Sequence, residues 1–435
     1  MNSKSDRDQQ NAQRLSASAR SGAGDGIEVS LLTGGSDRPY VYGLTDALLS
    51  KNAALDIIGS DELNDPEIYN KPGVNFLNLR GDQRPGANFR IKIARITSYY
   101  SKLIRYAATA KPRIFHILWN NKFETFDRTL LMLYYKLLGK KIVLTAHNVN
   151  IAARDHNDSA FNRLTLRIQY RLADHIFVHT EMMKSELVQA FGVQETRVTV
   201  IPFGINNSVP NTDLTPGEAR KKLGIRCDEK TILFFGRIKP YKGLEYLMAA
   251  SRRLPAKHDD YRLLVVGSLD TLNGEQYNNA IREAMRADLP GVRTLLRAEF
   301  VPDNDIEIYF KAADVLVLPY TDIYQSGVLF LAHSFGLPVL AADVGSLKDD
   351  IVAGKTGFVF RPQDPVDLAR AIELYFASEL YADLDGRRPE IKDYTKERHS
   401  WDVVGRMTMS VYAGLLRNDT RKLADSDAPS ISVSD

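Results

Sequence analysis

The chain has 435 residues, too many for one hydrophobic core of usual size, because such cores stop growing near roughly 250–300 residues, and we therefore expect two domains. Hydrophobic residues at 44% and charged residues at 26% exclude a largely disordered chain, and the net charge of +3 singles out no class of partner. The single cysteine, Cys227, excludes an internal disulfide and favours a reducing compartment.

Both ends of the chain are polar. Residues 1–26 lack the apolar segment of a signal peptide, and no run approaches the roughly 18 apolar residues that span a bilayer. We expect a cytoplasmic protein with a disordered leader at 1–26 and a disordered tail at 419–435.

From residue 27 to 205, short β-rich runs alternate with amphipathic stretches. We expect strands at 27–32, 55–58, 74–79, 114–118, 141–145, 175–179 and 198–201, and helices at 40–50, 88–110, 124–138, 159–172 and 181–191. This alternation predicts βαβ units around a mostly parallel sheet.

Positive charge is concentrated in one part of this first domain. Residues 89–141 contain twelve Lys or Arg but only two acidic residues, Glu124 and Asp127. Such a patch attracts anionic surfaces, such as phospholipid headgroups or a substrate that carries pyrophosphate. The alternative is a set of solvated helix faces.

Residues 206–217 break the pattern with two prolines and a glycine, and indicate a linker between domains. The alternation then restarts over 218–395, with expected strands at 231–235, 262–266, 292–300, 315–318, 338–341 and 357–360, and helices at 244–253, 276–287, 306–312 and 364–376. A final amphipathic segment at 396–418 places residues 401, 404, 407, 411 and 415 on one face, which we expect to pack back on the domains.

Two motifs follow strands of the second domain, where parallel sheets bind ligands. In the first, Gly236 allows a tight exit from the strand, and Arg237 and Lys242 are two cations ahead of a helix, an arrangement that suits a diphosphate. In the second, residues 325–328, Ser326 is positioned to cap a helix and Gly327 lets backbone amides approach a phosphate. Taken alone, either motif is also typical of an ordinary turn.

The two motifs, their order and the sequence around them resemble family 4 of the retaining glycosyltransferases, which have the two-domain GT-B fold. The resemblance runs from about residue 27 to 411 and rests on 175–205, Gly236-Arg237 with Lys242-Gly243, Phe300-Val301-Pro302, Ala312-Ala313-Asp314 with Leu318-Pro319, Gly336-Leu337-Pro338 and Gly354-Lys355-Thr356-Gly357-Phe358. It implies two Rossmann-like doubly wound α/β domains that face each other across a cleft, with a C-terminal helix that packs back.

The resemblance also implies site residues. Arg237 and Lys242 would neutralise the diphosphate of a UDP- or GDP-sugar donor, and His147 matches a histidine that similar enzymes bring to the donor sugar. Nucleobase and phosphate contacts would come from Phe300, Val301, Gln325, Ser326, Gly327 and Val328. The first domain would meet a saccharide acceptor. The basic stretch at 89–141 motivates the further expectation that this acceptor is a lipid-linked saccharide of exopolysaccharide or surface-glycan synthesis, met at the inner face of the plasma membrane.

The family usually has a pair of glutamates ahead of the Gly-x-Pro, and here Ile323 and Leu331 stand in their places. This departure puts in doubt how the donor sugar and ribose are recognised. It leaves open a protein that binds nucleotide-sugars without catalysis.

In the first domain, Gly34 and Gly35 follow the opening strand, where similar enzymes place a loop near donor phosphate and acceptor. The full dinucleotide fingerprint is missing, which disfavours the remaining alternative, an NAD-dependent oxidoreductase. His116 stands near the end of another strand and is a candidate for the acceptor contact, together with Trp119 and Asn120.

We expect no metal, no cofactor and no nucleic-acid partner. The Asp303-Asn304-Asp305 run mimics a metal-binding carboxylate pair, but Asn304 with Glu307 three residues later indicates a helix capping box. The histidines and the cysteine show no zinc-ligand spacing.

Overall fold

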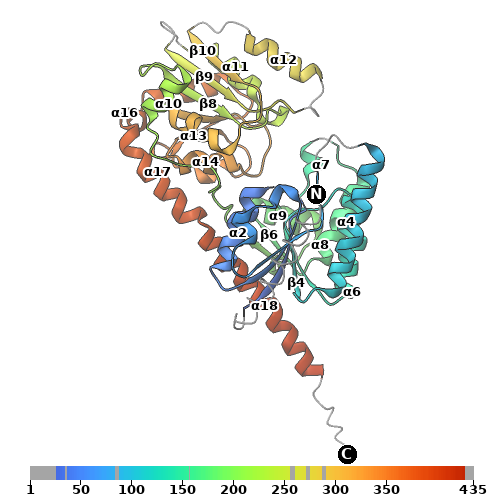
Figure 1. The fold of residues 1–435 in the computed structure, drawn as a ribbon. Coiled ribbons are helices and arrows are strands. Elements are labelled where there is room, and N and C mark those ends of the chain that lie inside the picture. The colour runs from blue at the N-terminus through green and yellow to red at the C-terminus, as the bar shows by residue number, and fades with distance from the viewer. Residues whose placement is uncertain are drawn as a thin grey trace, which may run out of the picture. The chain divides into compact units, whose positions relative to one another are not determined.

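The computed structural model describes residues 26–34, 37–83, 88–155, 157–254, 260–270, 275–286 and 291–426. The chain divides into two compact units, the first formed by Met1–Pro202 with Trp401–Asp435 and the second by Phe203–Ser400. Figure 1 labels the elements of both. Within the described residues, no helix combines the length and the apolar character needed to cross a bilayer.

The first unit contains a parallel sheet of seven strands in its described part, in the order β3-β2-β1-β4-β5-β6-β7. Their bounds are β1 Glu28–Leu32, β2 Ala54–Gly59, β3 Val74–Asn78, β4 Ile114–Ile117, β5 Lys141–Thr145, β6 His175–Val178 and β7 Val198–Val200. The strand order reverses between β1 and β4, and the carboxyl ends of these two strands are therefore where a ligand is expected.

The helices of this unit are α2 Arg38–Leu49, α3 Pro66–Tyr69, α4 Phe89–Thr109, α5 Glu124–Phe126, α6 Met132–Leu137, α7 Ile151–Arg154, α8 Ala160–Leu172, α9 Glu181–Phe191 and α18 Trp401–Ser426. Their starts follow from capping chemistry. The side chains of Asp37, Ser159 and Thr180 accept hydrogen bonds from backbone N–H groups in the first turns of α2, α8 and α9. A π-helical turn at Asp127–Leu131 interrupts the helix predicted at 124–138.

Helix α18 packs on the first unit, against α2. Its most deeply buried side chains are Trp401, Val404, Thr408 and Tyr412. The predicted apolar face is therefore correct at 401 and 404, but the buried positions then are 408 and 412 instead of 407 and 411. Tyr412 faces inward, where its hydroxyl lies 2.6 Å from the Nδ1 of His116.

The second unit repeats the architecture with a six-stranded parallel sheet in its described part, ordered β10-β9-β8-β11-β12-β13. The strands are β8 Lys230–Phe235, β9 Tyr261–Val266, β10 Val292–Arg297, β11 Val315–Leu318, β12 Val339–Ala342 and β13 Gly357–Phe360. The helices are α10 Pro216–Leu223, α11 Leu244–Ser251, α12 Glu275–Arg286, α13 Asp303–Ala312, α14 Gly327–Ser334, α15 Pro365–Phe376, α16 Glu379–Ala382 and α17 Leu384–His399.

The core of the second unit lies on both faces of its sheet. On one face, Leu247 and Ile372 bury α11 and α15 against the strands. On the other, Phe310 and Leu329 bury α13 and α14. Helices on both faces of a parallel sheet define a doubly wound α/β unit, and the order of its six strands is that of a Rossmann fold.

The predicted boundaries differ from the division of the structure. The segment 206–217, predicted as a linker, belongs to the second unit, and α10 begins inside it at Pro216 with a capping box between Thr215 and Glu218. Before α10, the carboxylate of Glu307 accepts hydrogen bonds from the backbone N–H of Thr212 at 2.5 Å and from its hydroxyl at 3.0 Å. These long-range contacts tie the segment to α13.

The predicted capping box at Asn304 and Glu307 was wrong. Helix α13 begins at Asp303 with Pro302 at its N-cap position, which makes no side-chain capping bond. Glu307 is buried and also pairs with Lys311 at 2.6 Å. Its carboxylate therefore bonds to Thr212 and Lys311 and does not cap the helix.

The two places where the chain passes between units lie beside each other in the second unit. The backbone N–H of Ile205 donates to the carbonyl of His399 at 3.2 Å, and the Nδ1 of His399 donates to the carbonyl of Phe203 at 3.2 Å. The ring of His399 also packs against Phe330 of α14 in a tilted arrangement, with 4.0 Å between ring centres. The first helical residue beyond this point is Trp401, where α18 begins.

Candidate functional site

The loop Gly236–Gly243 leaves the carboxyl end of β8, the strand at the switch point of the second sheet. Gly236 has φ of 106°, and a β-carbon at this position would stand 2.8 Å from the Nζ of Lys242. The backbone angle therefore favours glycine, and a β-carbon here would also displace the amine of Lys242.

Lys242 is a buried cation, with 8% of the residue exposed. Its Nζ donates a hydrogen bond to the hydroxyl of Tyr320 at 3.2 Å and lies 5.1 Å from the centre of that ring. Among the described residues Lys242 has no carboxylate partner. Burial lowers the pKa of Lys242, and the nearby charges of Arg237 and Lys239 lower it further.

Arg237 is more accessible. Its side chain is 65% exposed, and its Nη1 lies 3.9 Å from the Oδ2 of Asp270. Lys239 engages the same carboxylate oxygen more closely, at 3.1 Å. The carboxylate is thus taken up mainly by Lys239, and the guanidinium of Arg237 remains accessible to an anion from solution.

The second predicted loop lies beside Lys242. Ser326 stands at the N-cap position of α14 but makes no capping bond, contrary to the prediction, and its Oγ lies 3.4 Å from the hydroxyl of Tyr320. Tyr320 therefore joins Lys242 to Ser326. Gly327, the first residue of α14, is exposed, and a β-carbon at Gly236 would stand 3.8 Å from a methyl carbon of Val328.

The remaining predicted contacts of this unit divide into accessible and buried residues. Gln325 is partly exposed, and Phe300 is 76% exposed beyond the end of β10, so both side chains can meet a ligand. Val301 is 6% exposed and packs in the core with Ile306. A nucleobase contact from this pair therefore falls to the ring of Phe300.

The positions of the usual glutamates are filled by packing side chains. Leu331 is 5% exposed within the core that covers α14, and Ile323 packs against the same cluster. Neither side chain can form a hydrogen bond, so polar contacts at this end of the loop fall to the backbone, Gln325 and Ser326.

In the first unit, His147 lies in a cluster of rings at the carboxyl end of β5. It stacks on Trp119, with ring centres 4.3 Å apart and planes 5° apart, and meets Tyr40 edge-on at 4.6 Å. Its Nδ1 lies 3.2 Å from the Nε2 of His179. Burial lowers the pKa of His147 well below its ordinary value, with a further contribution from His179, so the ring is neutral at pH 7.

His147 also lines a cavity of about 380 Å³, which we call the β4–β5 pocket. The loops after β4 and β5 form much of it. Its polar lining includes Trp119, Asn120, His147, Asn148 and Asn150. The volume falls within the roughly 300–1,000 Å³ of ordinary ligand pockets.

His116 does not have the position that the sequence suggested. It lies inside β4, is 1% exposed, and uses both ring nitrogens within the protein, bonding Tyr412 at 2.6 Å and Thr145 at 2.7 Å. We therefore do not place it among the ligand contacts, since it acts as a structural hydrogen bonder.

Gly34 has φ of 52°, and a β-carbon there would stand 1.9 Å from the carbonyl oxygen of Trp119. Glycine is thus required for the close approach of the loops after β1 and β4. Gly35 lies outside the described residues.

Two residues that the sequence reasoning left without a role complete these sites. Tyr320, two residues beyond β11, connects Lys242 of the Gly236–Gly243 loop with Ser326, and His179, just beyond β6, contacts His147. Both follow strands at the carboxyl edge of their sheets, which was the available signal.

Comparison with known proteins agrees with this architecture. The family described as Glycosyltransferase Family 4 matches residues 19–209, and that described as Glycosyl transferases group 1 matches residues 217–398. A D-inositol 3-phosphate glycosyltransferase of Geodermatophilus obscurus is 26% identical over 367 residues, covering 80% of this chain and 79% of the relative.

Two solved structures show the same fold. Sucrose-phosphate synthase from Thermosynechococcus elongatus has a TM-score of 0.70 at 19% identity and covers 90% of this chain and 100% of its own. Anabaena HepE in complex with UDP-glucose has a TM-score of 0.66 at 17% identity, with coverage of 89% and 100%. The protein therefore belongs to the family 4 glycosyltransferases and has the GT-B fold. The oxidoreductase alternative is not carried further.

Proposed function

We propose that the protein transfers a sugar from a UDP- or GDP-sugar to a saccharide acceptor with retention of anomeric configuration and without a metal ion. The observation that carries the proposal is Lys242, a buried amine beside two other cations and without a carboxylate partner in the described chain. A buried charge of this kind is costly unless an anion binds next to it. HepE, with UDP-glucose bound, shows that this fold accommodates such a ligand.

The chemistry demands positive charge at this place. The bond between the anomeric carbon and the phosphate oxygen breaks, and negative charge builds on the leaving diphosphate. Arg237 and Lys242 would neutralise that charge, and each well-placed donor of this kind is worth on the order of 3 kcal/mol. The backbone of residues 325–328 and the hydroxyl of Ser326 would hold the rest of the donor.

Retention would follow from attack on the face that the nucleotide leaves. The acceptor hydroxyl oxygen bonds to the anomeric carbon, and its proton passes to the departing phosphate oxygen, so no covalent enzyme intermediate is required. In the first unit, the β4–β5 pocket would take the acceptor saccharide, and neutral His147 would contribute a hydrogen bond to sugar. The catalytic set is then Arg237, Lys242 and His147.

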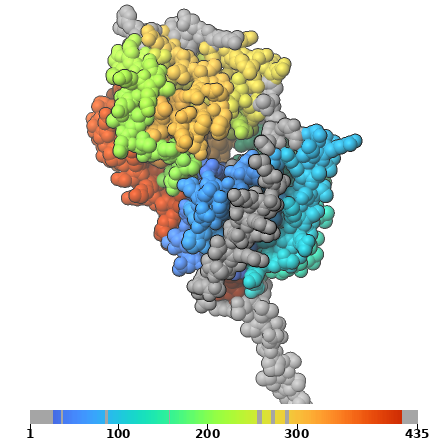
Figure 2. All heavy atoms as spheres, viewed as in Figure 1, coloured from blue at the N-terminus to red at the C-terminus, as the bar shows by residue number. Residues whose placement is uncertain are grey.

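We further propose that the acceptor is a lipid-linked saccharide of exopolysaccharide or surface-glycan synthesis, met at an anionic membrane surface. Helix α4, from the basic segment, lies on the surface of the first unit, where Figure 2 shows it in cyan. Its exposed apolar residues, Phe89 at 77%, Ile91 at 44% and Ile93 at 48%, lie among Lys and Arg side chains. Basic residues mixed with exposed apolar ones favour contact with anionic lipid.

A thermal-shift screen with UDP, GDP, ADP and NAD tests the donor assignment, because only ligands of the folded state raise the melting temperature. We expect UDP or GDP to stabilise the wild type and to have little effect on Lys242→Ala. Arg252→Ala is the control, since it removes an exposed positive charge of the same unit at the end of α11. Equal stabilisation of Lys242→Ala and wild type would overturn the diphosphate assignment.

Sugar transfer is measured with the nucleotide-sugar that the screen selects. We expect Lys242→Ala to lower turnover by a factor of about one hundred or more. A protein that binds the donor but shows neither transfer nor hydrolysis would be the non-catalytic alternative. Flotation with vesicles of neutral or anionic lipid tests the membrane contact, and binding that is indifferent to lipid charge would contradict it.

A further inference from the structure

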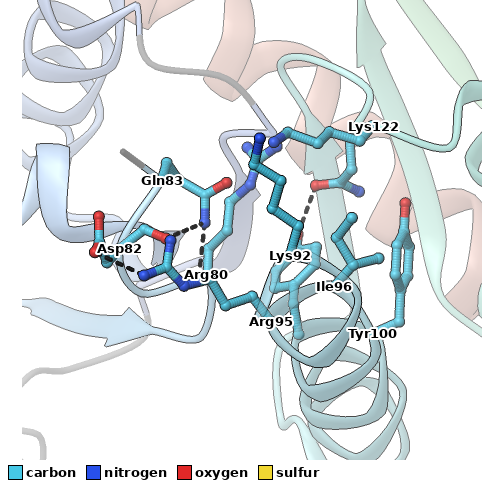
Figure 3. Close-up of a pocket in the computed structure, with 10 residues that line it drawn as sticks. Arg80, Asp82, Gln83, Lys92, Arg95, Ile96, Tyr100 and Lys122 are labelled. Carbon is cyan, nitrogen blue, oxygen red and sulfur yellow. Dashed lines mark hydrogen bonds and ion pairs between the residues drawn. The ribbon is translucent and has the colours of Figure 1, made fainter. Parts of the chain in front are cut away.

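A second cavity of the first unit, separate in its lining from the β4–β5 pocket, has a volume of about 210 Å³. We call it the β3–α4 pocket, and Figure 3 shows it. Its lining residues are Arg80, Asp82, Gln83, Lys92, Arg95, Ile96, Tyr99, Tyr100, Asn121 and Lys122. The volume is below that of typical ligand pockets and suits one small group rather than a whole nucleotide-sugar.

The lining comes from three places at the carboxyl edge of the sheet. Arg80 follows β3, Lys122 follows β4, and Lys92 lies on the first turn of α4. Arg80 also donates a hydrogen bond to the carbonyl of Gly34, just beyond β1. The pocket therefore stands at the switch point of the first sheet, as the Lys242 loop does in the second.

Four cationic side chains line the pocket against one carboxylate, that of Asp82. Asp82 pairs with Arg95 at 2.9 Å. Arg80 lies over the ring of Tyr99, at 5.7 Å. Lys92 and Lys122 form no ion pair within the described part of the chain. The charges of Lys92 and Lys122 are therefore the ones left uncompensated, since Asp82 pairs with Arg95 and the buried carboxylate of Asp127 interacts with Arg80.

The polar groups at the base bond to one another, and only the Oδ2 of Asp127 among them is buried without a hydrogen-bond partner in the described residues. The hydroxyl of Tyr99 donates to the Oδ1 of Asn121 at 2.6 Å, and that of Tyr100 donates to the Oδ1 of Asp127 at 2.9 Å. The Nδ2 of Asn121 donates to the same Asp127 oxygen at 3.2 Å. These bonds fix the base around the π-helical turn, so a ligand would be met chiefly by the cations above it.

We propose that the β3–α4 pocket binds the phosphate or diphosphate group of the acceptor, held by Arg80, Lys92 and Lys122. This inference rests on the proposed function and extends it by naming an anionic group on the acceptor. Cations around a small pocket recognise phosphate oxygens through charge-assisted hydrogen bonds, and the exposed amines of Lys92 and Lys122 are accessible to such an anion.

Two sources share this chemistry. One is a soluble phosphomonoester, the kind of compound named for the inositol phosphate glycosyltransferase of Geodermatophilus obscurus. The other is the phosphate of a lipid carrier. Exposed Phe123 lies against the ring of Tyr100, which lines the pocket, with 5.8 Å between ring centres, and provides apolar surface for the lipid source. Phe89, 77% exposed, precedes Lys92 by three residues on α4.

Calorimetric titration with inorganic phosphate tests the site in the full chain. We expect Lys92→Ala/Lys122→Ala to weaken phosphate binding at least about tenfold. Lys102→Ala/Lys111→Ala is the matched control, because it removes two exposed lysines of the same basic segment that do not line the pocket, and it should bind as the wild type does. Equal phosphate binding by both double variants, or none by the wild type, would overturn the proposal.

The variants can tell a failure of the phosphate site in the first unit from a failure of the donor assignment. UDP or GDP binding depends on Lys242 in the second unit, whereas phosphate binding here depends on Lys92 and Lys122, so each is lost by its own variant. If phosphate binding falls only in Lys242→Ala, the anion site of the first unit is refuted.

Two arms separate the sources. Competition of inorganic phosphate by inositol phosphate but not by inositol supports a soluble acceptor. Flotation with phosphatidylglycerol vesicles that requires Lys92 and Lys122, and is absent with phosphatidylcholine, supports a lipid phosphate. If neither depends on the two lysines, the pocket is not an acceptor site and the proposal fails.

Discussion

The Nδ1 of His147 lies 3.2 Å from the Nε2 of His179, and the Nδ1 of His179 lies 3.2 Å from the carbonyl oxygen of Ile201. A carbonyl only accepts, so the Nδ1 of His179 carries a proton. We take the ring of His179 to be neutral, so that its Nε2 is an acceptor, and the hydrogen bond between the rings then requires a proton on the Nδ1 of His147. This leaves the Nε2 of His147 as a hydrogen-bond acceptor.

His179 is therefore predicted to position His147 by fixing its tautomer. His179→Phe, which keeps a ring in the cluster but removes the acceptor, should lower turnover roughly 3- to 10-fold, the value of one hydrogen bond. Nitrogen-15 NMR of the histidine rings checks the cause: His147 should be protonated at Nδ1 in the wild type and mixed in the variant. A wild-type His147 protonated at Nε2 would refute the relay.

Gly236→Ala should damage donor binding. The substitution places a methyl group where the amine of Lys242 lies, at a φ of 106° that alanine rarely adopts, so we expect a loss of about 1–3 kcal/mol of stability and weaker nucleotide binding. Urea unfolding and nucleotide titration measure the two effects.

Gly354→Ala is the control for backbone strain. It also has a positive φ, of 73°, but a β-carbon there would have nothing within 4 Å. We expect a loss of stability of about 1–2 kcal/mol with unchanged nucleotide binding. If both variants bind nucleotide equally, the close approach of Lys242 to Gly236 does not matter for the donor.

Much of the fold was predictable because parallel strands buried on both faces are short, continuous apolar runs. β5, β11 and β13 have the predicted bounds, while β10 ends at Arg297 rather than at 300. Helix α10 was missed because it begins with Pro216 and Gly217, which read as the end of a linker, and α17 because its sequence is polar with Pro389 inside it.

Part of the candidate site was predictable because its residues form local motifs in the sequence. Motif spacing singled out Arg237, Lys242 and residues 325–328. The structure links Lys242 to Ser326 through Tyr320, whereas the ion pair of Arg237 is with Asp270. Glu307 and His116 were misinterpreted because their partners, Thr212 and Tyr412, are distant in sequence. Local patterns carry no information on such contacts.

The lowered pKa of Lys242 predicts a pH dependence of donor binding. The amine loses its proton below the ordinary value of 10.5, so the KM for the donor should rise as pH increases through that lowered pKa. The free energy of unfolding should rise with pH although donor binding weakens. Between the lowered pKa of folded Lys242 and the ordinary 10.5 of the unfolded chain, the unfolded chain holds more protons than the folded one.

Steady-state kinetics between about pH 7.5 and 10 measures this effect. Lys242→Arg keeps its charge throughout and should lose the alkaline rise in KM, even if its KM is higher at neutral pH. A wild-type KM that stays flat over this range would contradict a lysine cation at the diphosphate.

The buried histidines predict acid destabilisation. Burial lowers the pKa of His116 to about 3 and that of His175 to about 4, from the ordinary 6.5. Below pH 6.5 the two histidines bind protons in the unfolded chain but stay neutral in the folded protein. The free energy of unfolding therefore falls as pH falls toward the lowered pKa values of the folded rings. Each histidine contributes about 1.4 kcal/mol per pH unit in this window.

Tryptophan fluorescence isolates this effect, since Trp119 and Trp401, the two tryptophans of the chain, both belong to the first unit. In urea unfolding at pH 7 and pH 5, His116→Asn should be less stable than wild type at pH 7 but should lose about 2 kcal/mol less on acidification. His333→Asn, in the second unit, is the control and should leave the fluorescence-monitored difference unchanged. An equal loss in wild type and His116→Asn would mean that His116 is not held neutral by its burial between Tyr412 and Thr145.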